Sequence, residues 1–198
     1  SYRDLPIKIY QSCQVWRHET KATKPLLRDR EFYWIEAHNA FATREEAEAQ
    51  VLEDMEVART VLYEKLGIPF LFFRRPEWDK FAGAEYTFGS DALMPDGAAI
   101  QLPSTHFLAQ KFSKAFNIKF LDEDETEKFV WQTCYGPGIS RIYAALISIH
   151  GDNKGLVLPF ELAPAQVVIV PIPAKEKAKE VVEKCAELRK RLESMGLR

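Results

Sequence analysis

Hydrophobic and polar positions near the start of the chain predict a pair of strands. Residues 6–16 begin with a proline and are rich in β-branched and aromatic residues, and residues 31–36 have the same character. The polar loop at 20–25 is longer than a tight hairpin requires, and long ordered loops often carry function. We therefore expect two paired strands whose connecting loop has a task.

Further strand signals follow along the chain. Residues 86–88 and 98–102 lie on either side of a turn signal at Pro95-Asp96-Gly97, and residues 129–135 have the apolar, β-branched pattern of another strand. Short strands joined by turns favour antiparallel pairing. The pattern therefore predicts an antiparallel sheet.

Two helices are expected to flank this sheet. Thr43 and Glu46 have the spacing of a capping box. Apolar residues then recur at helical intervals until Gly67, namely Ala47, Val51, Met55, Ala58, Leu62 and Leu66. Residues 139–149 form a helical run too apolar for the surface, so we expect burial against the sheet. The fold class is α/β in the broad sense, and α+β in the narrower one.

The pattern changes at residues 158–164. Residues 166–172 have the continuous apolar character of a buried strand in a parallel sheet, and an amphipathic helix is predicted from Ala178 to Met195, ending at Gly196. One strand and one helix in about 35 residues have too little to pack against to form a domain. We expect a main domain at 1–160 and, at 161–198, a linker with the start of a second domain.

Composition limits the partners. The chain has 198 residues, 46% of them hydrophobic, and its 27 basic and 29 acidic residues give a net charge of −2, so no global field attracts nucleic acid. Cys13, Cys134 and Cys185 are odd in number and far apart, which argues for a reducing compartment and a cytoplasmic location. We expect neither an export signal nor a membrane span.

Candidate chemistry lies beside the first two predicted strands and at the start of the later apolar helix. Arg17 and Glu19 follow the first strand, Arg28 and Asp29 precede the second, and Gly136-Pro137-Gly138-Ile139-Ser140-Arg141 opens an apolar helix. Three separated arginines suggest one polyphosphate. Taken singly, such residues have simpler interpretations, because an Arg-x-Glu pair on a strand is more often a surface ion pair. Likewise, Trp34 and Phe81 alone would be core aromatics, His106 a satisfied polar residue and Cys134 a small buried hydrophobe.

Longer stretches of sequence favour a shared site over these simpler interpretations. Arg17-His18-Glu19 with Arg30-Glu31-Phe32 resembles motif 2 of the class II aminoacyl-tRNA synthetases, and Gly136 to Arg141 resembles motif 3. Four further runs resemble the archaeal and eukaryotic prolyl-tRNA synthetases in particular: residues 30–38, 80–83, 101–106 and 150–159. The chain is therefore similar to that family over nearly its whole length. Motif 1 and an upstream loop of the proline pocket are missing, which predicts a fragment of a longer enzyme.

The resemblance implies a class II antiparallel sheet with flanking helices, followed by the first strand and helix of an α/β anticodon-binding domain. It implies activation of L-proline by ATP and transfer to tRNA(Pro), by a homodimer in the complete enzyme. Arg17 and Arg141 would be the catalytic residues, because positioned cations stabilise the charge of the phosphorus transition state. The ATP-binding residues implied are Arg17, Glu19, Arg28, Asp29, Phe32, Gln101, Ser104 and Arg141.

A small apolar pocket with a few polar groups is expected for proline. The residues implied are Trp34, Glu36, Phe81, His106, Cys134 and Gly136. Mg²⁺ would accompany ATP, near Gln101, and no metal-binding motif is otherwise assigned. Two alternatives stay open. One is a non-catalytic synthetase-like binding or regulatory module. The other is a truncated inactive fragment with a structural or interaction role, whose last 35 or so residues dock on a partner. We expect reduced or absent aminoacylation by this chain alone.

Overall fold

The chain divides into two compact units, residues 1–157 and 158–198. The computed structural model describes residues 1–172 and 175–198. The division lies at the beginning of the segment where the sequence pattern changes. No helix among these described residues is both long enough and apolar enough to cross a bilayer.

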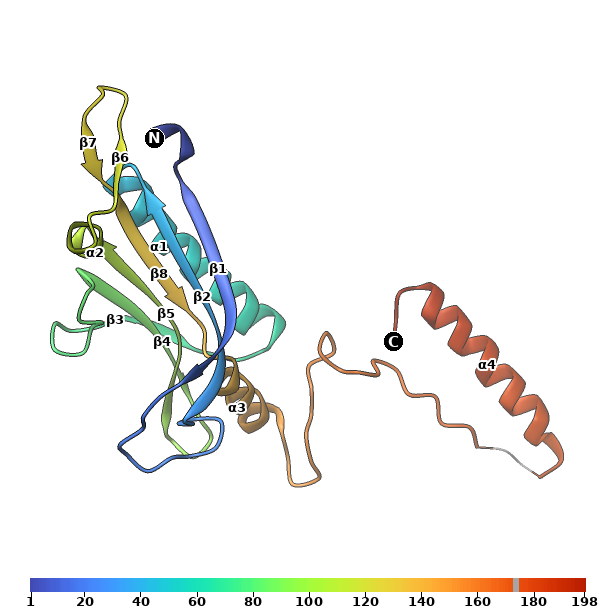
Figure 1. Ribbon diagram of the computed structural model, residues 1–198. Helices are drawn as coiled ribbons and strands as arrows, with labels where there is room; N and C mark the ends of the chain where they lie inside the picture. Colours follow the sequence, from blue (N-terminus) through green and yellow to red (C-terminus); the bar gives the residue numbers. More distant parts are fainter. Residues whose placement is uncertain (173–174) are drawn as a thin grey trace. The chain divides into compact units, whose positions relative to one another are not determined.

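A six-stranded sheet forms the first unit, in the order β1-β2-β8-β5-β4-β3, and every neighbouring pair is antiparallel (Figure 1). The antiparallel sheet expected from the sequence is thereby confirmed. Its strands are β1 (Ile7–Trp16), β2 (Glu31–Phe41), β3 (Leu71–Arg74), β4 (Tyr86–Leu93), β5 (Ala99–Ala109) and β8 (Trp131–Gly136).

The predicted pairing of the first two strands is confirmed, with Ile7 opposite Ala40 and Trp16 opposite Glu31. The strand expected at 129–135 is instead divided at Val130. Phe129 ends β7 (Glu127–Phe129), which pairs with β6 (Lys119–Leu121) in a separate hairpin. The division has a cause in hydrogen bonding, because the buried Val130 carbonyl accepts a 2.7 Å bond from the Ser113 hydroxyl and so leaves the strand ladder.

The first helix, α1 (Arg44–Ala58), begins at the predicted capping box, in which Thr43 and Glu46 bond reciprocally. It continues as a π-helical stretch, η2 (Arg59–Lys65), before the chain turns at Gly67 with φ of +62°. That left-handed conformation favours glycine, so the predicted stop is confirmed. A short 3-10 turn, η1 (Tyr2–Asp4), precedes β1.

The core lies between the sheet and α1, which packs against β2, β5 and β8. Its buried cluster consists of Phe41, Ala47, Val51, Phe107 and Ala109. The Phe107 ring stacks on the rings of Tyr86 and Trp131, at centroid distances of 4.9 and 6.2 Å. These contacts fix β5 at the centre of the sheet.

Two further helices contact the sheet. The helix α3 (Ile139–His150) packs against β2 and β5, and the short α2 (Lys111–Ala115) against β5 and β8. Only one side of α3 is buried, at Ala144, Ala145 and Leu146, whereas Ile139 and Tyr143 are 40% and 45% exposed. The expected packing of this helix against the sheet is confirmed, although part of its apolar surface is exposed.

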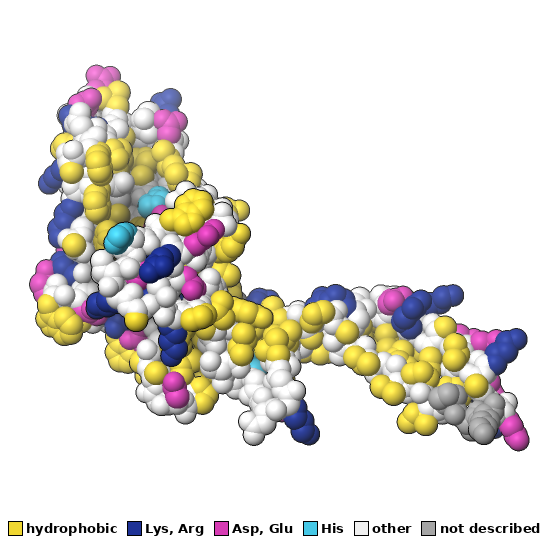
Figure 2. Space-filling model, turned by 60° about the horizontal axis from the view of Figure 1, so that its bottom comes forward, with side chains coloured by type: hydrophobic (Ala, Val, Ile, Leu, Met, Phe, Trp, Pro, Cys, Tyr) yellow, Lys and Arg dark blue, Asp and Glu magenta, His cyan; other side chains and the backbone are white. Residues whose placement is uncertain are grey.

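In the second unit, the helix α4 (Ala178–Ser194) is confirmed and follows the turn η3 (Lys175–Lys177). The strand expected at 166–172 is not formed. Val168, Val170 and Ile172 are 74%, 72% and 86% exposed, and hydrophobic side chains are visible at the surface of this segment in Figure 2. A strand exists only through hydrogen bonds to neighbouring strands, and the described part of this unit offers none.

Candidate active site

A cavity of about 530 Å³ lies in the first unit, at one face of the sheet. The structure brings every site residue expected from the sequence into its lining. Those residues are Arg17, Glu19, Arg28, Asp29, Phe32, Trp34, Glu36, Phe81, Gln101, Ser104, His106, Cys134, Gly136 and Arg141. Whether each performs its expected role stays a prediction, but their assembly from distant parts of the chain is a property of the fold.

Strand alternation explains this assembly. Side chains at every second residue of a strand share a face. On β2 the lining residues are Phe32, Trp34 and Glu36, and on β5 they include Ser104 and His106. The intervening Thr105 points to the other face, where its hydroxyl donates a 2.7 Å bond to Asp54 of α1. The apolar core and the cavity thus occupy opposite faces of the same strands.

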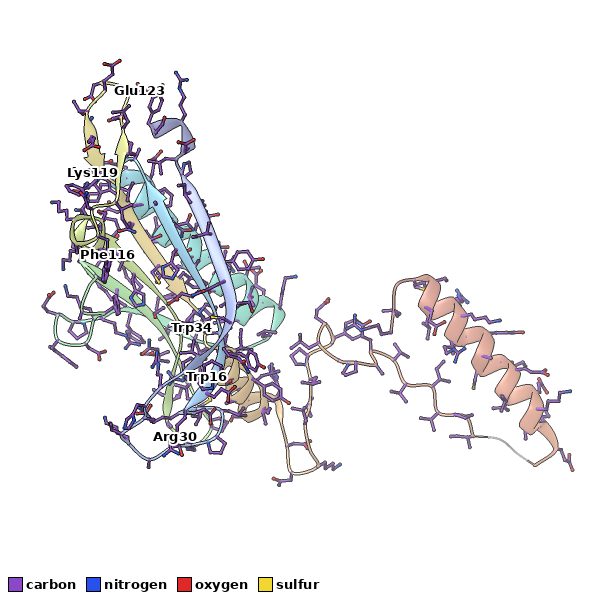
Figure 3. All side chains as sticks on the ribbon, in the orientation of Figure 1. Trp16, Arg30, Trp34, Phe116, Lys119 and Glu123 are labelled. Carbon is purple, nitrogen blue, oxygen red and sulfur yellow. The ribbon has the colours of Figure 1, made fainter. Side chains whose placement is uncertain are left out.

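The loop between β1 and β2 supplies two arginines. The Arg17 N–H donates to the Arg30 carbonyl at 2.8 Å, which holds together the two ends of the loop, where Trp16 and Arg30 are labelled in Figure 3. The Arg17 guanidinium lies over the Phe32 ring, 5.1 Å from its centroid. Arg28 forms an ion pair with Glu19, with Nη1 and Oε1 3.2 Å apart.

The third arginine comes from the first turn of α3. Arg141 donates from Nη2 and Nε to the Leu27 carbonyl, at 2.9 and 3.3 Å, and from Nη1 to the Gln101 carbonyl at 3.2 Å. Burial lowers the pKa of its guanidinium, and the positive charges of Arg28 and Arg17 lower it further. Arg17, Arg28 and Arg141 therefore define a positively charged end of the cavity, in which Glu19 pairs with Arg28.

The other end of the cavity is aromatic with a few polar groups. The His106 ring contacts the Thr87 hydroxyl through Nδ1 at 2.9 Å and the Ser104 hydroxyl through Nε2 at 3.1 Å. The Phe81 ring lies 5.0 Å from the His106 ring, between centroids. Burial lowers the pKa of His106 to about 4, so the imidazole is neutral at pH 7.

Trp34 also lines the aromatic end of the cavity, and its ring meets the Phe32 ring edge to face, with 5.9 Å between the centroids. Its indole Nε1 is buried, and no acceptor among the described residues lies within hydrogen-bonding distance of it. A buried donor without a partner is unfavourable, so this N–H is suited to an acceptor on a ligand. Figure 3 labels Trp34 at the middle of the sheet.

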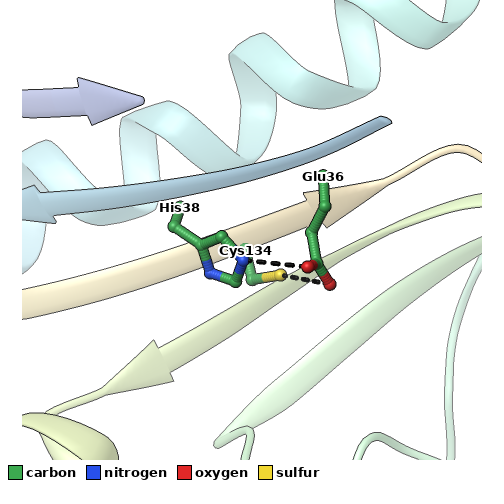
Figure 4. A group of neighbouring side chains, drawn as sticks. All are labelled: Glu36, His38 and Cys134. Carbon is green, nitrogen blue, oxygen red and sulfur yellow. Dashed lines mark hydrogen bonds and ion pairs between the residues drawn. The ribbon is translucent and has the colours of Figure 1, made fainter. Parts of the chain in front are cut away.

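Glu36 and Cys134 also line the aromatic end of the cavity. The Cys134 thiol lies 3.9 Å from a Glu36 carboxylate oxygen, whose partner oxygen is 3.0 Å from His38 Nε2 (Figure 4). Burial raises the pKa of Cys134 to about 12, and the Glu36 charge adds to the effect. The thiol is therefore protonated at pH 7 and is not a nucleophile in this state.

Sequence reasoning missed several lining residues, among them Arg75, Lys80 and Thr87. Lys80 belongs to a run that carries the family resemblance, which could have drawn attention to it. Thr87 shows no signal in the sequence, because it acquires its contact through the register that places it opposite His106 on β5. Arg75 is fixed beside Asp91, with 2.5 Å between Nη2 and Oδ1.

The arrangement suits a ligand with two chemically different ends. Converging guanidinium groups bind phosphate oxygens, and a flanking aromatic face can hold a base. The aromatic end, with a neutral imidazole and an indole N–H, suits a small, largely apolar group.

Comparison with known proteins gives the class. Residues 1–150 match the family of the tRNA synthetase class II core domain (G, H, P, S and T). The chain belongs to this family. The antiparallel sheet with flanking helices expected from the sequence is confirmed by the structural likeness described next.

Within the class, the similarity is to the prolyl members. The chain is 63% identical to a proline–tRNA ligase of Thermofilum pendens and 49% identical to one of Methanobrevibacter smithii, over 100% of its length in each case. It also aligns over 100% of its length with the structure of Giardia lamblia prolyl-tRNA synthetase in complex with prolyl-adenylate, with a TM-score of 0.95 and 41% identity. It spans 41% and 42% of the two curated relatives and 41% of that structure.

Proposed function

We propose that the chain carries the site at which L-proline and ATP react to form prolyl-adenylate. In this reaction a proline carboxylate oxygen attacks the α-phosphate of ATP, and pyrophosphate leaves. We further propose that the complete protein, a proline–tRNA ligase, transfers the prolyl group to the terminal ribose of tRNA(Pro). The observation that carries the proposal is a cavity that has three guanidinium groups at one end and an aromatic pocket at the other.

The phosphate end stabilises the transition state in this proposal. Negative charge grows on the phosphate oxygens as the bond to the carboxylate forms, and fixed cations stabilise that charge. Arg17 and Arg141 are assigned to the reacting phosphate and Arg28 to the terminal phosphates. Arg141 is well suited to this role, because two backbone carbonyls hold its guanidinium in place. No protein nucleophile is required, since the proline carboxylate attacks.

Adenine and magnesium have separate places in the proposal. The Phe32 face holds the adenine ring, and Glu19 accepts from its exocyclic amine. Mg²⁺ neutralises phosphate charge when bound, and it prefers oxygen ligands from phosphates and one or two protein groups. The lining offers such oxygens on Asp29 and Gln101, with the Ser104 hydroxyl assigned to the nucleotide. These residue types fit a magnesium ion that enters with ATP.

The aromatic end binds proline in this proposal. Trp34, Phe81 and Gly136 would enclose the ring, while Glu36 would receive the imino nitrogen. His106 stays neutral and Cys134 stays protonated at pH 7, so neither side chain adds a charge to the pocket. An apolar pocket distinguishes ligands that differ by one methylene by only about 1–3 kcal/mol. We therefore expect some activation of similar small amino acids.

Three wider assignments belong to the same proposal. Residues 1–160 are the class II catalytic core, and residues 161–198 a linker with the start of an anticodon-binding domain. The complete enzyme acts as a homodimer in the cytoplasm. The three cysteines are free in the structure, which agrees with a reducing compartment.

Proline-dependent exchange of pyrophosphate into ATP, measured with the complete protein, tests the proposal directly. We expect Arg17→Ala and Arg141→Ala to lower the exchange rate by about 100-fold or more, because each removes a charge from the transition state. Arg189→Ala, at an exposed position of α4, is the matched control and should leave exchange unchanged. Intact exchange in Arg17→Ala or Arg141→Ala would refute the phosphate roles. ATP binding without any proline-dependent exchange would favour a non-catalytic module.

A further inference from the structure

Three side chains of different chemistry meet on the cavity side of β2 and β8. The register places His38 directly opposite Cys134, and Glu36 lies two residues before His38 on the same face. One ligand atom from each residue lies within 4.8 Å of the other two. In Figure 4 the imidazole and the thiol lie next to each other, and each is joined by a dashed line to an oxygen of the Glu36 carboxylate.

The spacing of these atoms matches that around a small metal ion. Zinc binds nitrogen, oxygen and sulfur at about 2.0–2.3 Å, which places tetrahedral ligand atoms roughly 3–4 Å from one another. Here His38 Nε2 and a Glu36 oxygen are 3.0 Å apart, and the other Glu36 oxygen is 3.9 Å from the Cys134 sulfur. Small side-chain rotations would therefore bring all three to one ion.

The ligand types discriminate among metals. A thiolate and an imidazole favour Zn²⁺ and related ions, whereas Mg²⁺ and Ca²⁺ take oxygen ligands. Gln11 Nε2 donates to a Glu36 oxygen at 3.2 Å, the kind of outer contact that orients a carboxylate ligand. The nearby His106 is not a fourth ligand, because Thr87 and Ser104 hold both of its ring nitrogens.

We propose that Glu36, His38 and Cys134 bind one Zn²⁺ ion, with the thiol proton released to solvent, and that the bound ion blocks the amino-acid end of the cavity. Glu36 and Cys134 belong to the cavity lining, so an ion between them occupies that space. His38 is half exposed and gives the ion a path from solvent. The blocking effect rests on the proposed function, whereas the binding of zinc does not.

Cobalt titration tests the binding. Co²⁺ replaces Zn²⁺ in such sites, and its bond to a thiolate gives a near-ultraviolet absorption band. We expect one equivalent of Co²⁺ to produce this band, Zn²⁺ to abolish it, and excess Mg²⁺ to leave it intact. Cys134→Ser should eliminate the band and His38→Gln should weaken binding about ten-fold or more, while Cys185→Ser, in the second unit, should bind as wild type. A band that survives in Cys134→Ser, or the absence of saturable binding, would overturn the site.

Inhibition tests the consequence. We expect Zn²⁺ to raise the apparent KM for proline in pyrophosphate exchange, and His38→Gln to retain exchange while requiring about ten-fold more Zn²⁺ for half inhibition. Cobalt binding without competition against proline would overturn the blocking role. A protein without exchange in the absence of zinc would refute the proposed function, yet the cobalt titration would still decide the site. Urea unfolding of each variant shows whether it is folded.

Discussion

His106 is contacted at both ring nitrogens by hydroxyl groups, Thr87 on one side and Ser104 on the other. A neutral imidazole has one donor and one acceptor nitrogen, and a hydroxyl group can serve either. Burial opposes the charged form and lowers the pKa to about 4. A histidine in the proposed proline pocket thus stays uncharged through the physiological range.

This burial predicts a pH dependence of stability. The unfolded chain takes up a proton near pH 6.5, and the native His106 only near pH 4. Between these values the unfolded state binds more protons, so the free energy of unfolding falls as the pH decreases, by at most about 3 kcal/mol from this residue. Urea unfolding from pH 7 to 4 measures the slope.

Carboxylates also contribute to the slope, so the informative quantity is the difference between variants. His106→Gln should show a shallower decrease than wild type, and His18→Gln, at an exposed position, should show the wild-type decrease. Identical slopes in His106→Gln and wild type would contradict the buried neutral state.

At the scale of elements, α1 is hydrogen-bonded to β5 on the face of the sheet opposite the cavity. Asp54 accepts bonds from the Thr105 hydroxyl at 2.7 Å and from the Gln50 amide at 2.8 Å, and all three residues are buried. Since Ser104 and His106 neighbour Thr105 on the opposite face, the position of these cavity residues depends on a carboxylate that never touches the cavity.

Asp54→Ala should therefore destabilise the chain by about 1–3 kcal/mol, because it leaves the Thr105 hydroxyl and the Gln50 amide without an acceptor. Glu53→Ala is a matched control on the same helix, where an exposed carboxylate pairs with Lys8, and we expect a loss below about 1 kcal/mol. Chemical denaturation measures both. Equal losses in the two variants would show that the Asp54 network adds nothing.

The elements differ in how well the sequence predicts them. The period of apolar residues predicted α1 and α4, and β-branched runs predicted β1 and β2, because local pattern decides these elements. The strands β3, β6 and β7 have three or four residues each, too few for a period to be recognised. The segment 166–172 has strand composition, but within residues 1–172 and 175–198 no strand pairs with it, and pairing is a property of tertiary structure.

Some residues of the candidate site could be predicted from the sequence and others could not. Arg17, Glu19 and Arg141 lie in motifs that can be recognised in the sequence, and the family resemblance alone predicted that they belong to one site. Thr87 became part of the cavity only through strand register, so it was not predicted. Contacts made by backbone carbonyls, such as that of Leu27 with Arg141, have no side-chain signature at all.

At the scale of the whole molecule, the cavity lies within one unit. Every residue of its lining belongs to residues 1–157. A chain shortened to residues 1–157 should therefore bind ATP with the affinity of the full chain, within about two-fold. Isothermal titration calorimetry of the two chains measures this. A loss of binding in the folded shorter chain would show that residues 158–198 contribute to the site.

Arg141 is half-buried beside Arg17 and Arg28, and the repulsion among their positive charges has a consequence for thermal stability. Any multivalent anion that settles among the three guanidinium groups favours the folded state, and the thermal midpoint rises with the logarithm of its concentration. Pyrophosphate should raise the midpoint more than chloride at equal ionic strength, with neither adenine nor proline present, and Arg141→Ala should lose this difference. If chloride and pyrophosphate act alike, the arginines do not form one anion site. A melting curve in a simple salt series can therefore report on the cavity without any catalysis, and the choice of buffer anion would set the measured stability of this protein.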